Sequence, residues 1–334
     1  MSTTLASKTP VPIQKKDFET MLSFSRTVFN LKNNPSYLAA MFADLPDAAH
    51  IPTQWPSVLM GFDFHLTPDG PKLIEINNNA GGLYVGQQRW LTQPETVFSD
   101  TLAQRLLRMF PAAWQNIAIM DDDVTEQYMY PEMCAYAELL RTDGRKVWVC
   151  SPHDLQLRES GLYLDGVKID AIYNRHTDFY LDEHALAHIR SAYQQGQVTL
   201  NPHPRSYALI GDKSRMVDWW RDGVLEACID TSSIAHIRAV TPETHQLAEM
   251  DADQAWAERK QWVFKPSARH GGKGVVLGKA MSRKRFATLD VAETIVQQLV
   301  PASTVDVDGQ EMKFDVRLYM HGEQLIALAG RVWR

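Results

Sequence analysis

Hydrophobic positions near the start of the chain recur at the spacing of amphipathic helices. Between residues 13 and 45, apolar side chains follow one another at intervals of three and four, which is the period of a helix with one buried face. The tripeptide Asn33-Asn34-Pro35 interrupts this pattern, because proline disfavours a helix interior and asparagine favours a cap. The pattern therefore predicts two helices that meet at this tripeptide.

Two short runs rich in strand-forming residues come next, at residues 58–66 and 72–76. Between them lies Pro68-Asp69-Gly70, a sequence typical of tight turns, so the two runs predict a β-hairpin. On adjacent antiparallel strands Asp63 and Glu75 can face each other. Because side chains alternate along a strand, Glu75 and Asn77 share one face, and we expect Ile74 and Ile76 to point into the core.

The middle of the chain alternates between strand and helix patterns. Residues 117–120, 146–150 and 171–173 predict strands, and residues 131–141 predict a helix between the first two. This β-α-β order is typical of a parallel sheet. The remaining segments predict helices at 84–110 and 206–224, strands at 262–265, 274–277 and 294–300, and a terminal hairpin formed by 313–319 and 324–334.

These patterns predict an α/β (α+β) protein of three units. A chain of 334 residues is longer than one typical domain. We expect residues 1–110 to hold helices and the polar hairpin, 111–205 to form a small α/β domain, and 206–334 to form a region with the terminal hairpin.

Composition narrows the class of protein. Hydrophobic residues make up 45% and charged residues 22% of the chain, which is typical of folded globular proteins. The net charge of −6 predicts neither nucleic-acid nor membrane binding. Three separated cysteines argue against a disulfide framework or a zinc site. The N-terminus has no apolar core of signal-peptide length, so we expect a cytoplasmic protein.

The segment from Phe264 to Val275 carries the strongest chemical signal. A predicted strand delivers Lys265, and a glycine-rich turn with Arg269 and Lys273 follows. Glycine backbone allows close approach to phosphate oxygens, and the cations suit a triphosphate. The spacing matches neither the P-loop nor the GxGxxG pattern. Taken alone, the segment is equally consistent with a solvated hairpin.

A second lysine and the polar hairpin favour phosphate binding over a solvated hairpin. Lys213 precedes an amphipathic run, although a lone lysine there is more typical of a surface residue. Asp63, Glu75 and Asn77 would form a hard oxygen site, which is the kind that Mg²⁺ prefers when substrate phosphates complete its coordination. The two lysines and this site together predict an enzyme that uses Mg-ATP.

The combined motifs resemble the ATP-grasp carboxylate-amine ligases, and specifically the circularly permuted branch that contains eukaryotic glutathione synthetase. In the unpermuted family the Asp…Glu-x-Asn strands follow both lysines, whereas here Asp63, Glu75 and Asn77 precede them. The resemblance covers nearly the whole chain, including the pair Asp315 and Arg317 in the terminal hairpin. It implies a permuted ATP-grasp fold in which residues 111–205 form the small substrate (pre-ATP-grasp) domain.

The resemblance also implies roles for particular residues. The enzyme would activate a carboxylate as an acyl phosphate and couple it to an amine, such as that of an amino acid or short peptide, and would form a homodimer. The implied ATP-binding residues are Lys213, Lys265, the lid residues Gly271, Gly272, Lys273 and Gly274, and the adenine-binding segment Gln297, Gln298, Leu299 and Val300. The implied Mg²⁺ site is Asp63, Glu75 and Asn77, and the implied catalytic residues are Arg317, Arg331 and Lys265.

Two departures from the family keep an alternative open. The stretch 267–270 has no acidic lid residue, and the chain ends soon after Arg331. A nucleotide-binding pseudoenzyme with the same fold is therefore the alternative to a ligase, and a thiol or hydroxyl acceptor is a variant. An oxidoreductase is disfavoured, because the loop after residue 120 has no glycine for a dinucleotide.

Weaker candidates lie at the ends of the predicted parallel strands. Arg175 and Asp178 follow the strand at 171–173, and the acidic run 121–123 follows the strand at 117–120. Ligands bind at the carboxyl ends of such strands, so Arg175 and Asp178 are candidate substrate contacts. Ordinary capping and surface pairing explain them equally well, and a solvated loop is the simpler interpretation of 121–123.

Overall fold

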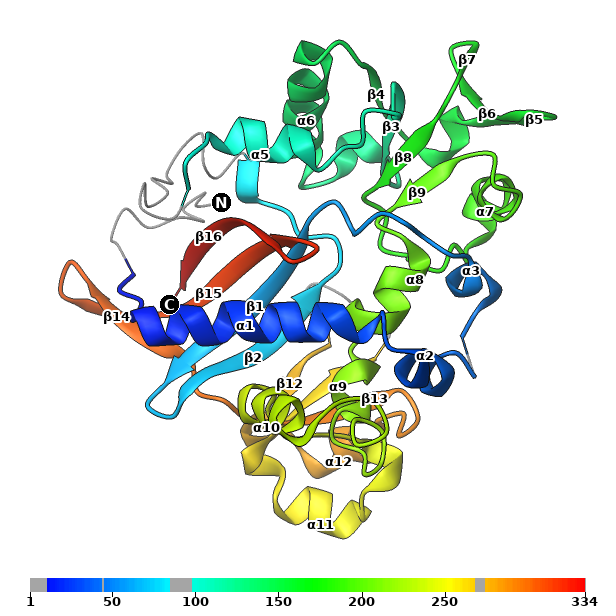
Figure 1. Cartoon of the computed structure of the whole chain (residues 1–334). Coiled ribbons are helices and arrows are strands. Elements are labelled where there is room, and N and C mark those ends of the chain that lie inside the picture. The colour runs from blue at the N-terminus through cyan, green and yellow to red at the C-terminus, as the bar shows by residue number, and fades with distance from the viewer. Residues whose placement is uncertain (1–10, 44, 85–97, 268–273, 334) are drawn as a thin grey trace.

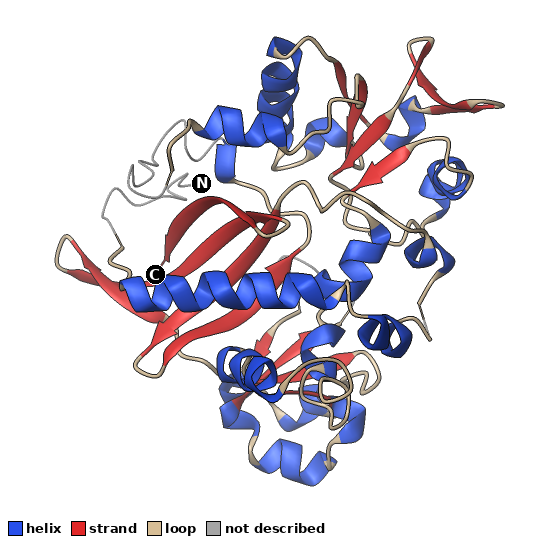
Figure 2. Ribbon diagram, in the orientation of Figure 1, coloured by secondary structure: helices blue, strands red, loops and turns tan. Residues whose placement is uncertain are grey.

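The computed structural model describes residues 11–43, 45–84, 98–267 and 274–333. Within these ranges the strands form four sheets, and helices cover the faces of the larger ones (Figures 1 and 2). Parallel and antiparallel sheets occur together, so the predicted mixed α/β class is confirmed. None of the described helices has the length and hydrophobicity needed to cross a membrane.

The central sheet is antiparallel and brings distant parts of the chain together. Its strands run in the order β14-β15-β1-β2, and β16 pairs with the other edge of β15. The predicted hairpins are both present in it. The strands are β1 (Met60–Thr67), β2 (Gly70–Asn77), β14 (Ser303–Val307), β15 (Gln310–His321) and β16 (Gln324–Trp333).

One face of the central sheet is apolar. Helix α1 (Lys15–Leu31) lies across this face in Figure 1, with α10 (Thr231–Val240) beside it. Phe62 and Phe64 of β1 point into the core beneath α1, where the rings of Phe24 and Phe64 meet edge to face at 6.0 Å. The period of two then directs Asp63 to the opposite face. Helices α2 (Pro35–Met41) and α3 (Asp47–His50) follow α1, with a break at the predicted tripeptide.

A second antiparallel sheet runs in the order β10-β13-β11-β12. One of its faces packs against α11 through Phe264 and Val296. Lys265 and Gln297 occupy alternate positions on β11 and β13, so they point to the other face, toward the central sheet. The elements are β10 (Thr244–Gln246), α11 (Ala252–Ala257), β11 (Trp262–Pro266), β12 (Val276–Leu277), α12 (Arg283–Phe286) and β13 (Thr294–Gln298).

The predicted α/β domain contains a parallel sheet in the order β4-β3-β8-β9. Leu106 of α5 and Tyr136 of α6 share a core with Tyr319 and Ile326 of the central sheet. This unit therefore covers part of the second face of that sheet. The elements of this domain are β3 (Asn116–Met120), α6 (Tyr130–Thr142), β4 (Lys146–Cys150), β8 (Ala171–Asn174), α7 (Ala187–Gln194) and β9 (Thr199–Asn201), and α5 (Leu102–Arg108) precedes its predicted start and packs with it. A small sheet of β5 (Gln156–Arg158), β6 (Gly161–Leu164) and β7 (Val167–Lys168) projects from it.

The expected long helix at 206–224 is wrong. This stretch contains the end of α8 (Pro204–Ser206), a π-helical turn (Tyr207–Gly211) and α9 (Ser214–Asp218). The break has a local cause, because Asp212 is extended and its carboxylate accepts the Ser214 N–H at 2.9 Å. Asp212 thus begins a new helix immediately beyond Lys213. Of the helix expected at 84–110, α5 is described, and residues 85–97 lie outside the described ranges.

Replacing Phe64 with alanine tests the packing between α1 and the central sheet. Phe64 is fully buried, so Phe64→Ala should lower the free energy of unfolding by about 3–5 kcal/mol, as measured by urea denaturation. Lys16→Ala on the exposed side of α1 is the control and should change it by less than about 0.5 kcal/mol. Equal stability of the two variants would contradict the packing described.

Candidate functional site

The hairpin of β1 and β2 places its acidic residues opposite each other, as predicted. Asp63 pairs with Glu75, and a bulge follows immediately, so that Phe64 pairs with Leu73. The bulge changes one expectation. Leu73 is buried in the core, whereas Ile74 is only partly buried, because the extra residue shifts the alternation of β2. Ile76 points into the core as expected.

Asp63 lies among arginine side chains on the polar face of the central sheet. Arg317 donates to both of its carboxylate oxygens, with Nε–Oδ1 at 2.5 Å and Nη2–Oδ2 at 2.6 Å. Arg331 Nη2 donates to Asp63 Oδ2 at 2.8 Å and to Asp315 Oδ2 at 2.6 Å. Two carboxylates and two guanidinium groups thus form one network, which is buried except for part of Arg331. Burial alone would raise the pKa of Asp63, but the hydrogen bonds and charges of the arginines outweigh burial and lower it.

Glu75 and Asn77 provide the oxygen atoms that suit a divalent cation. Asn77 Nδ2 donates to Asp63 Oδ2 at 3.2 Å, which leaves the amide oxygen of Asn77 facing away from that carboxylate. Glu75 is partly exposed, and its carboxylate lies 3.6 Å from the ammonium of Lys213. A carboxylate and an amide oxygen next to a phosphate-binding cation fit Mg²⁺. Among the described residues, no cluster of three His, Cys, Asp or Glu side chains forms a metal site.

Lys213 and Lys265 approach the hairpin from different elements. Lys265 is buried on β11, and its Nζ donates to Gln297 Oε1 at 2.6 Å and to the Ile74 carbonyl at 3.1 Å. Burial lowers the pKa of Lys265 to about 8, with Glu75 acting to raise it and Lys213 to lower it further. The two lysines that the sequence singled out therefore meet beside Glu75.

The segment proposed to bind adenine forms the end of β13 and its continuation. The Gln297 side chain is occupied by Lys265 and by Thr244, whose Oγ1 accepts from Nε2 at 3.2 Å. The N–H groups of Gln298 and Leu299 donate to the carbonyls of Glu243 and Gln261. The Val300 carbonyl lies 3.1 Å from His65 Nδ1. This segment is thus held between the two antiparallel sheets, and its contact with a base stays a prediction.

The predicted lid lies mostly outside the described residues. Gly271, Gly272 and Lys273 belong to the range 268–273, whereas Gly274 is described and has a φ of +83°. Such a backbone favours glycine, because other residues are strained there. The phosphate-binding role of the lid therefore stays a prediction.

A cavity of about 260 Å³ lies beside the hairpin. Asn77 and Lys213 line it on one side, and Asp121, Tyr128 and Arg175 of the α/β unit line it on the other. Arg175 is held by Asn79 and by the Tyr173 hydroxyl, while burial raises the pKa of Asp121. The cavity therefore combines an acid and a cation at the carboxyl ends of β3 and β8.

Asp178, the other candidate after β8, forms hydrogen bonds with the local backbone. Its two carboxylate oxygens accept the N–H groups of Tyr180, at 3.2 Å, and Glu183, at 2.7 Å. It is also absent from the lining of the described cavity. Capping is therefore its observed role, which was the alternative to a substrate contact.

Glu132 is a buried residue that the sequence did not single out. From α6 its carboxylate accepts the Gly82 N–H at 2.7 Å and the Tyr84 N–H at 3.0 Å. A side chain at Gly81 would come within 2.8 Å of Arg175 Nη2 and 3.1 Å of Glu132 Oε2. Glu132 thus anchors the loop that follows Asn77 to the α/β unit. Only its place on an apolar helix face could have marked it, and a helical glutamate is most often exposed.

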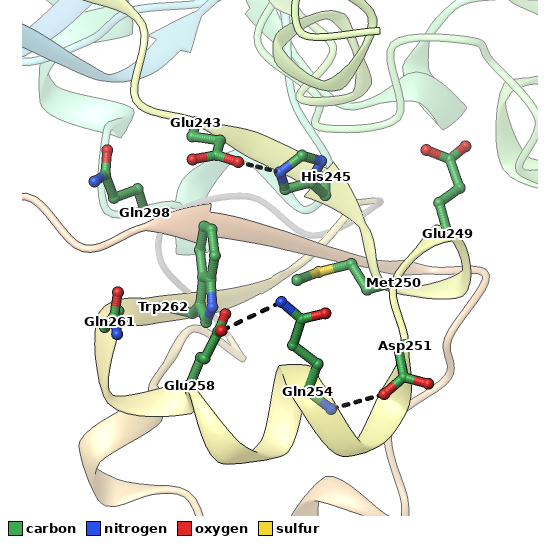
Figure 3. A pocket seen from close by; sticks show the side chains of 10 residues that line it. All are labelled: Glu243, His245, Glu249, Met250, Asp251, Gln254, Glu258, Gln261, Trp262 and Gln298. Atoms are coloured by element: carbon green, nitrogen blue, oxygen red, sulfur yellow. Dashed lines mark hydrogen bonds and ion pairs between the residues drawn. The ribbon is translucent and has the colours of Figure 1, made fainter.

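A larger cavity, of about 440 Å³, lies on the other face of the second sheet (Figure 3). Four acidic residues line it, but His245 pairs with Glu243 at 2.7 Å and Arg221 pairs with Glu249. Trp262 lines this cavity and lies on the face of β11 opposite Lys265. The sheet therefore separates this cavity from the lysines, and it is not part of the candidate site.

Replacing Glu132 with glutamine tests the anchoring of the loop. The amide has one acceptor oxygen in place of two, so Glu132→Gln leaves one of the two partly buried N–H groups without its side-chain partner and should lower the free energy of unfolding by about 1 kcal/mol. Urea denaturation measures this difference. Glu138→Gln on the exposed face of α6 is the matched control, and identical midpoints for the two variants would rule out the anchor.

Comparison with known proteins identifies the fold. No family model and no curated protein sequence matches the chain. A glutathione synthetase-like effector from Globodera pallida, in its apo form, aligns over 97% of this chain and 84% of its own, with a TM-score of 0.60 and 12% identity. A putative gamma-glutamylcysteine synthetase from Methylobacillus flagellatus KT aligns over 98% of this chain and 85% of its own, with a TM-score of 0.55 and 13% identity.

These similarities extend over nearly the whole chain at low sequence identity, so they establish the fold and not the activity. In the chain order observed here, the hairpin of Asp63 and Glu75 precedes both lysines. The chain therefore has the glutathione synthetase-like ATP-grasp fold in its circularly permuted form.

Proposed function

We propose that this protein is an ATP-dependent ligase that activates a carboxylate as an acyl phosphate and joins it to an amine. The observation that carries the proposal is the convergence of Lys213 and Lys265 on Glu75, beside Arg317 and Arg331. Four cations beside one hairpin suit a polyphosphate better than any neutral ligand. The fold supports the proposal as an analogy only.

Lys265 and Lys213 would bind the phosphates of ATP from opposite sides. Lys265 is held by Gln297 and the Ile74 carbonyl, so its ammonium is already oriented toward the hairpin. Lys213 lies at the start of α9, close to Glu75. Gly271, Gly272, Lys273 and Gly274 would cover the phosphates, and the backbone from Gln297 to Val300 would contact adenine.

Glu75 and Asn77, with Asp63 beside them, would hold Mg²⁺ at the terminal phosphates. When bound, Mg²⁺ neutralises the charge that develops during phosphoryl transfer. Arg317 and Arg331 would donate to the transferring phosphoryl group, because a fixed guanidinium suits such oxyanions. Their partners Asp63 and Asp315 orient both side chains before substrate arrives.

The reaction then takes two steps that balance. An oxygen of the substrate carboxylate attacks the γ-phosphorus, the bond from phosphorus to the β-phosphate oxygen breaks, and ADP leaves. The amine nitrogen next attacks the acyl carbon, the carbon–oxygen bond to phosphate breaks, and the amine loses a proton. The products are an amide, ADP and phosphate.

The cavity beside the hairpin is the proposed place for the organic substrates. Arg175 offers a guanidinium to a carboxylate, and Asp121 offers a carboxylate to an ammonium group. A molecule with both charges, such as an amino acid or a short peptide, therefore matches this lining. The cavity adjoins Asn77 and Lys213, so a carboxylate bound there lies next to the proposed phosphates.

A screen of carboxylates against amines with Mg-ATP tests this function. Release of ADP that requires one carboxylate and one amine, together with a stoichiometric amide by mass spectrometry, is the expected result. Nucleotide binding without any release of ADP would instead favour the nucleotide-binding pseudoenzyme. A thiol or hydroxyl acceptor would show itself as an ester-type product.

Replacing Glu75 with glutamine should abolish chemistry and spare the fold. The amide keeps the size of the side chain but loses the charge that attracts Mg²⁺, so ADP formation should fall by about 10²-fold or more. Binding of ADP without metal should persist, because both lysines remain. A folded Glu75→Gln variant that forms ADP at the wild-type rate in limiting Mg²⁺ would place the metal site elsewhere.

Binding of ATP near pH 8.5 should take up protons. The pKa of Lys265 is about 8 in the free protein, so part of this amine is neutral above that pH, and nearby phosphates would raise its pKa and protonate it. Calorimetry of Mg-ATP binding in buffers with different ionisation enthalpies measures this uptake. Lys265→Arg, which stays protonated, should reduce it, and equal uptake by both proteins would assign the proton to another group.

A further inference from the structure

Asp63 accepts hydrogen bonds from three neighbouring side chains. It is 2% exposed, and its two oxygens accept from Arg317 Nε and Nη2, Arg331 Nη2 and Asn77 Nδ2. An ionised carboxylate offers about four acceptor sites. Three of these donors meet Oδ2 and one meets Oδ1, so a metal ion bound through Oδ2 would have to displace a donor.

Arg317 and Arg331 in turn depend on Asp63 as a hydrogen-bond acceptor. Arg317 is buried and forms a bidentate pair with Asp63, while Arg331 bridges Asp63 and Asp315. A buried guanidinium without a carboxylate is costly, since the lost hydration is not replaced. Any movement of Asp63 toward a metal would leave this cost uncompensated.

Glu75 differs from Asp63 in each of these respects. Its side chain is 25% exposed, and its recorded ionic partner among the described residues is Lys213, at 3.6 Å. That distance is longer than a hydrogen bond, so the carboxylate oxygens can still accept a cation. The side chain of Asn77 is tethered to Asp63 through nitrogen, which directs its oxygen elsewhere.

We infer that Asp63 is a positioning residue for Arg317 and Arg331, and that Glu75 and Asn77 hold the divalent cation without it. This inference rests on the proposed function. Asp63 acts on the reaction by aiming two guanidinium groups at the phosphoryl group. Arg331 keeps Nη1 outside the bonds to Asp63 and Asp315, so this nitrogen can reach a ligand.

Binding of Mn²⁺ in the presence of ADP tests the assignment without any need for turnover. Mn²⁺ replaces Mg²⁺ as the probe, and the electron paramagnetic resonance signal of free Mn²⁺ gives its affinity for the protein–ADP complex. Asp63→Asn should keep this affinity within about threefold, whereas Glu75→Gln, the matched control, should lose at least about 10-fold. An equal loss in both variants would overturn the inference.

Thermal unfolding in EDTA gives a second test. The melting temperature of Asp63→Asn should fall if Asp63 positions the arginines, and it should rise if Asp63 belongs to the metal site. If Asp63 positions the arginines, Asp63→Asn should lower the melting temperature of the metal-free protein, because the buried Arg317 loses its carboxylate partner and Arg331 keeps only Asp315. If Asp63 mainly faces Glu75 across an empty metal site, Asp63→Asn should raise it by removing repulsion. An increase would contradict the inference.

A charge-balanced variant covers the case in which Asp63→Asn does not fold. Asp63→Asn combined with Arg317→Met removes one charge of each sign, and replacement of both partners of a buried pair is often tolerated. Its Mn²⁺ affinity should also stay near the wild-type value. If wild-type protein binds no ADP with Mn²⁺, the proposed function fails with the inference, whereas loss confined to the Asp63 variants refutes the inference alone.

Discussion

The pairing of buried charges on the polar face of the central sheet is the constraint on which the site depends. Asp63, Asp315, Arg317 and Arg331 lie on strands whose other face packs beneath α1. Buried charges of this kind are tolerated only when each one has a partner. The network therefore determines where the arginines point, and it leaves Glu75 to pair with Lys213 at 3.6 Å.

The central sheet also explains how remote parts of the chain come together at one site. β1 pairs with β2 on one side and with β15 on the other, so residues near 63, 75 and 317 become neighbours. The second sheet contributes Lys265 to the same site, through a hydrogen bond to the Ile74 carbonyl. Glu132 then ties the loop beyond Asn77 to the α/β unit, so the cavity and the hairpin share a common support.

Much of this arrangement could be predicted from the sequence, because it follows from local patterns. The hairpin itself follows from the strand pattern and the short turn. The turn alone would place Asp63 opposite Ile74, and the bulge brings Glu75 to that position instead. The features that could not be predicted from the sequence depend on tertiary contacts. The bulge after Asp63 replaces Ile74 with Leu73 in the core, and the arginine partners of Asp63 arrive from strands more than 250 positions away.

Glu132 is another residue whose role could not be predicted from the sequence. Its helix was expected, but its burial depends on the amide groups of Gly82 and Tyr84, which no helical pattern reveals. The break at Asp212 is a further case, since a capping side chain beside a glycine overrides an amphipathic run. Long and strongly patterned elements were therefore predictable, whereas side-chain partners and short irregular segments were not.

Binding of Mg-ATP at the site beside the hairpin is the central claim. Thermal denaturation with and without Mg-ATP measures this directly, because a ligand that binds only the native state raises its apparent stability. We expect the melting temperature to rise with Mg-ATP in wild-type protein and to change little in Lys265→Ala. An unchanged melting temperature of the wild-type protein at saturating Mg-ATP would contradict the account.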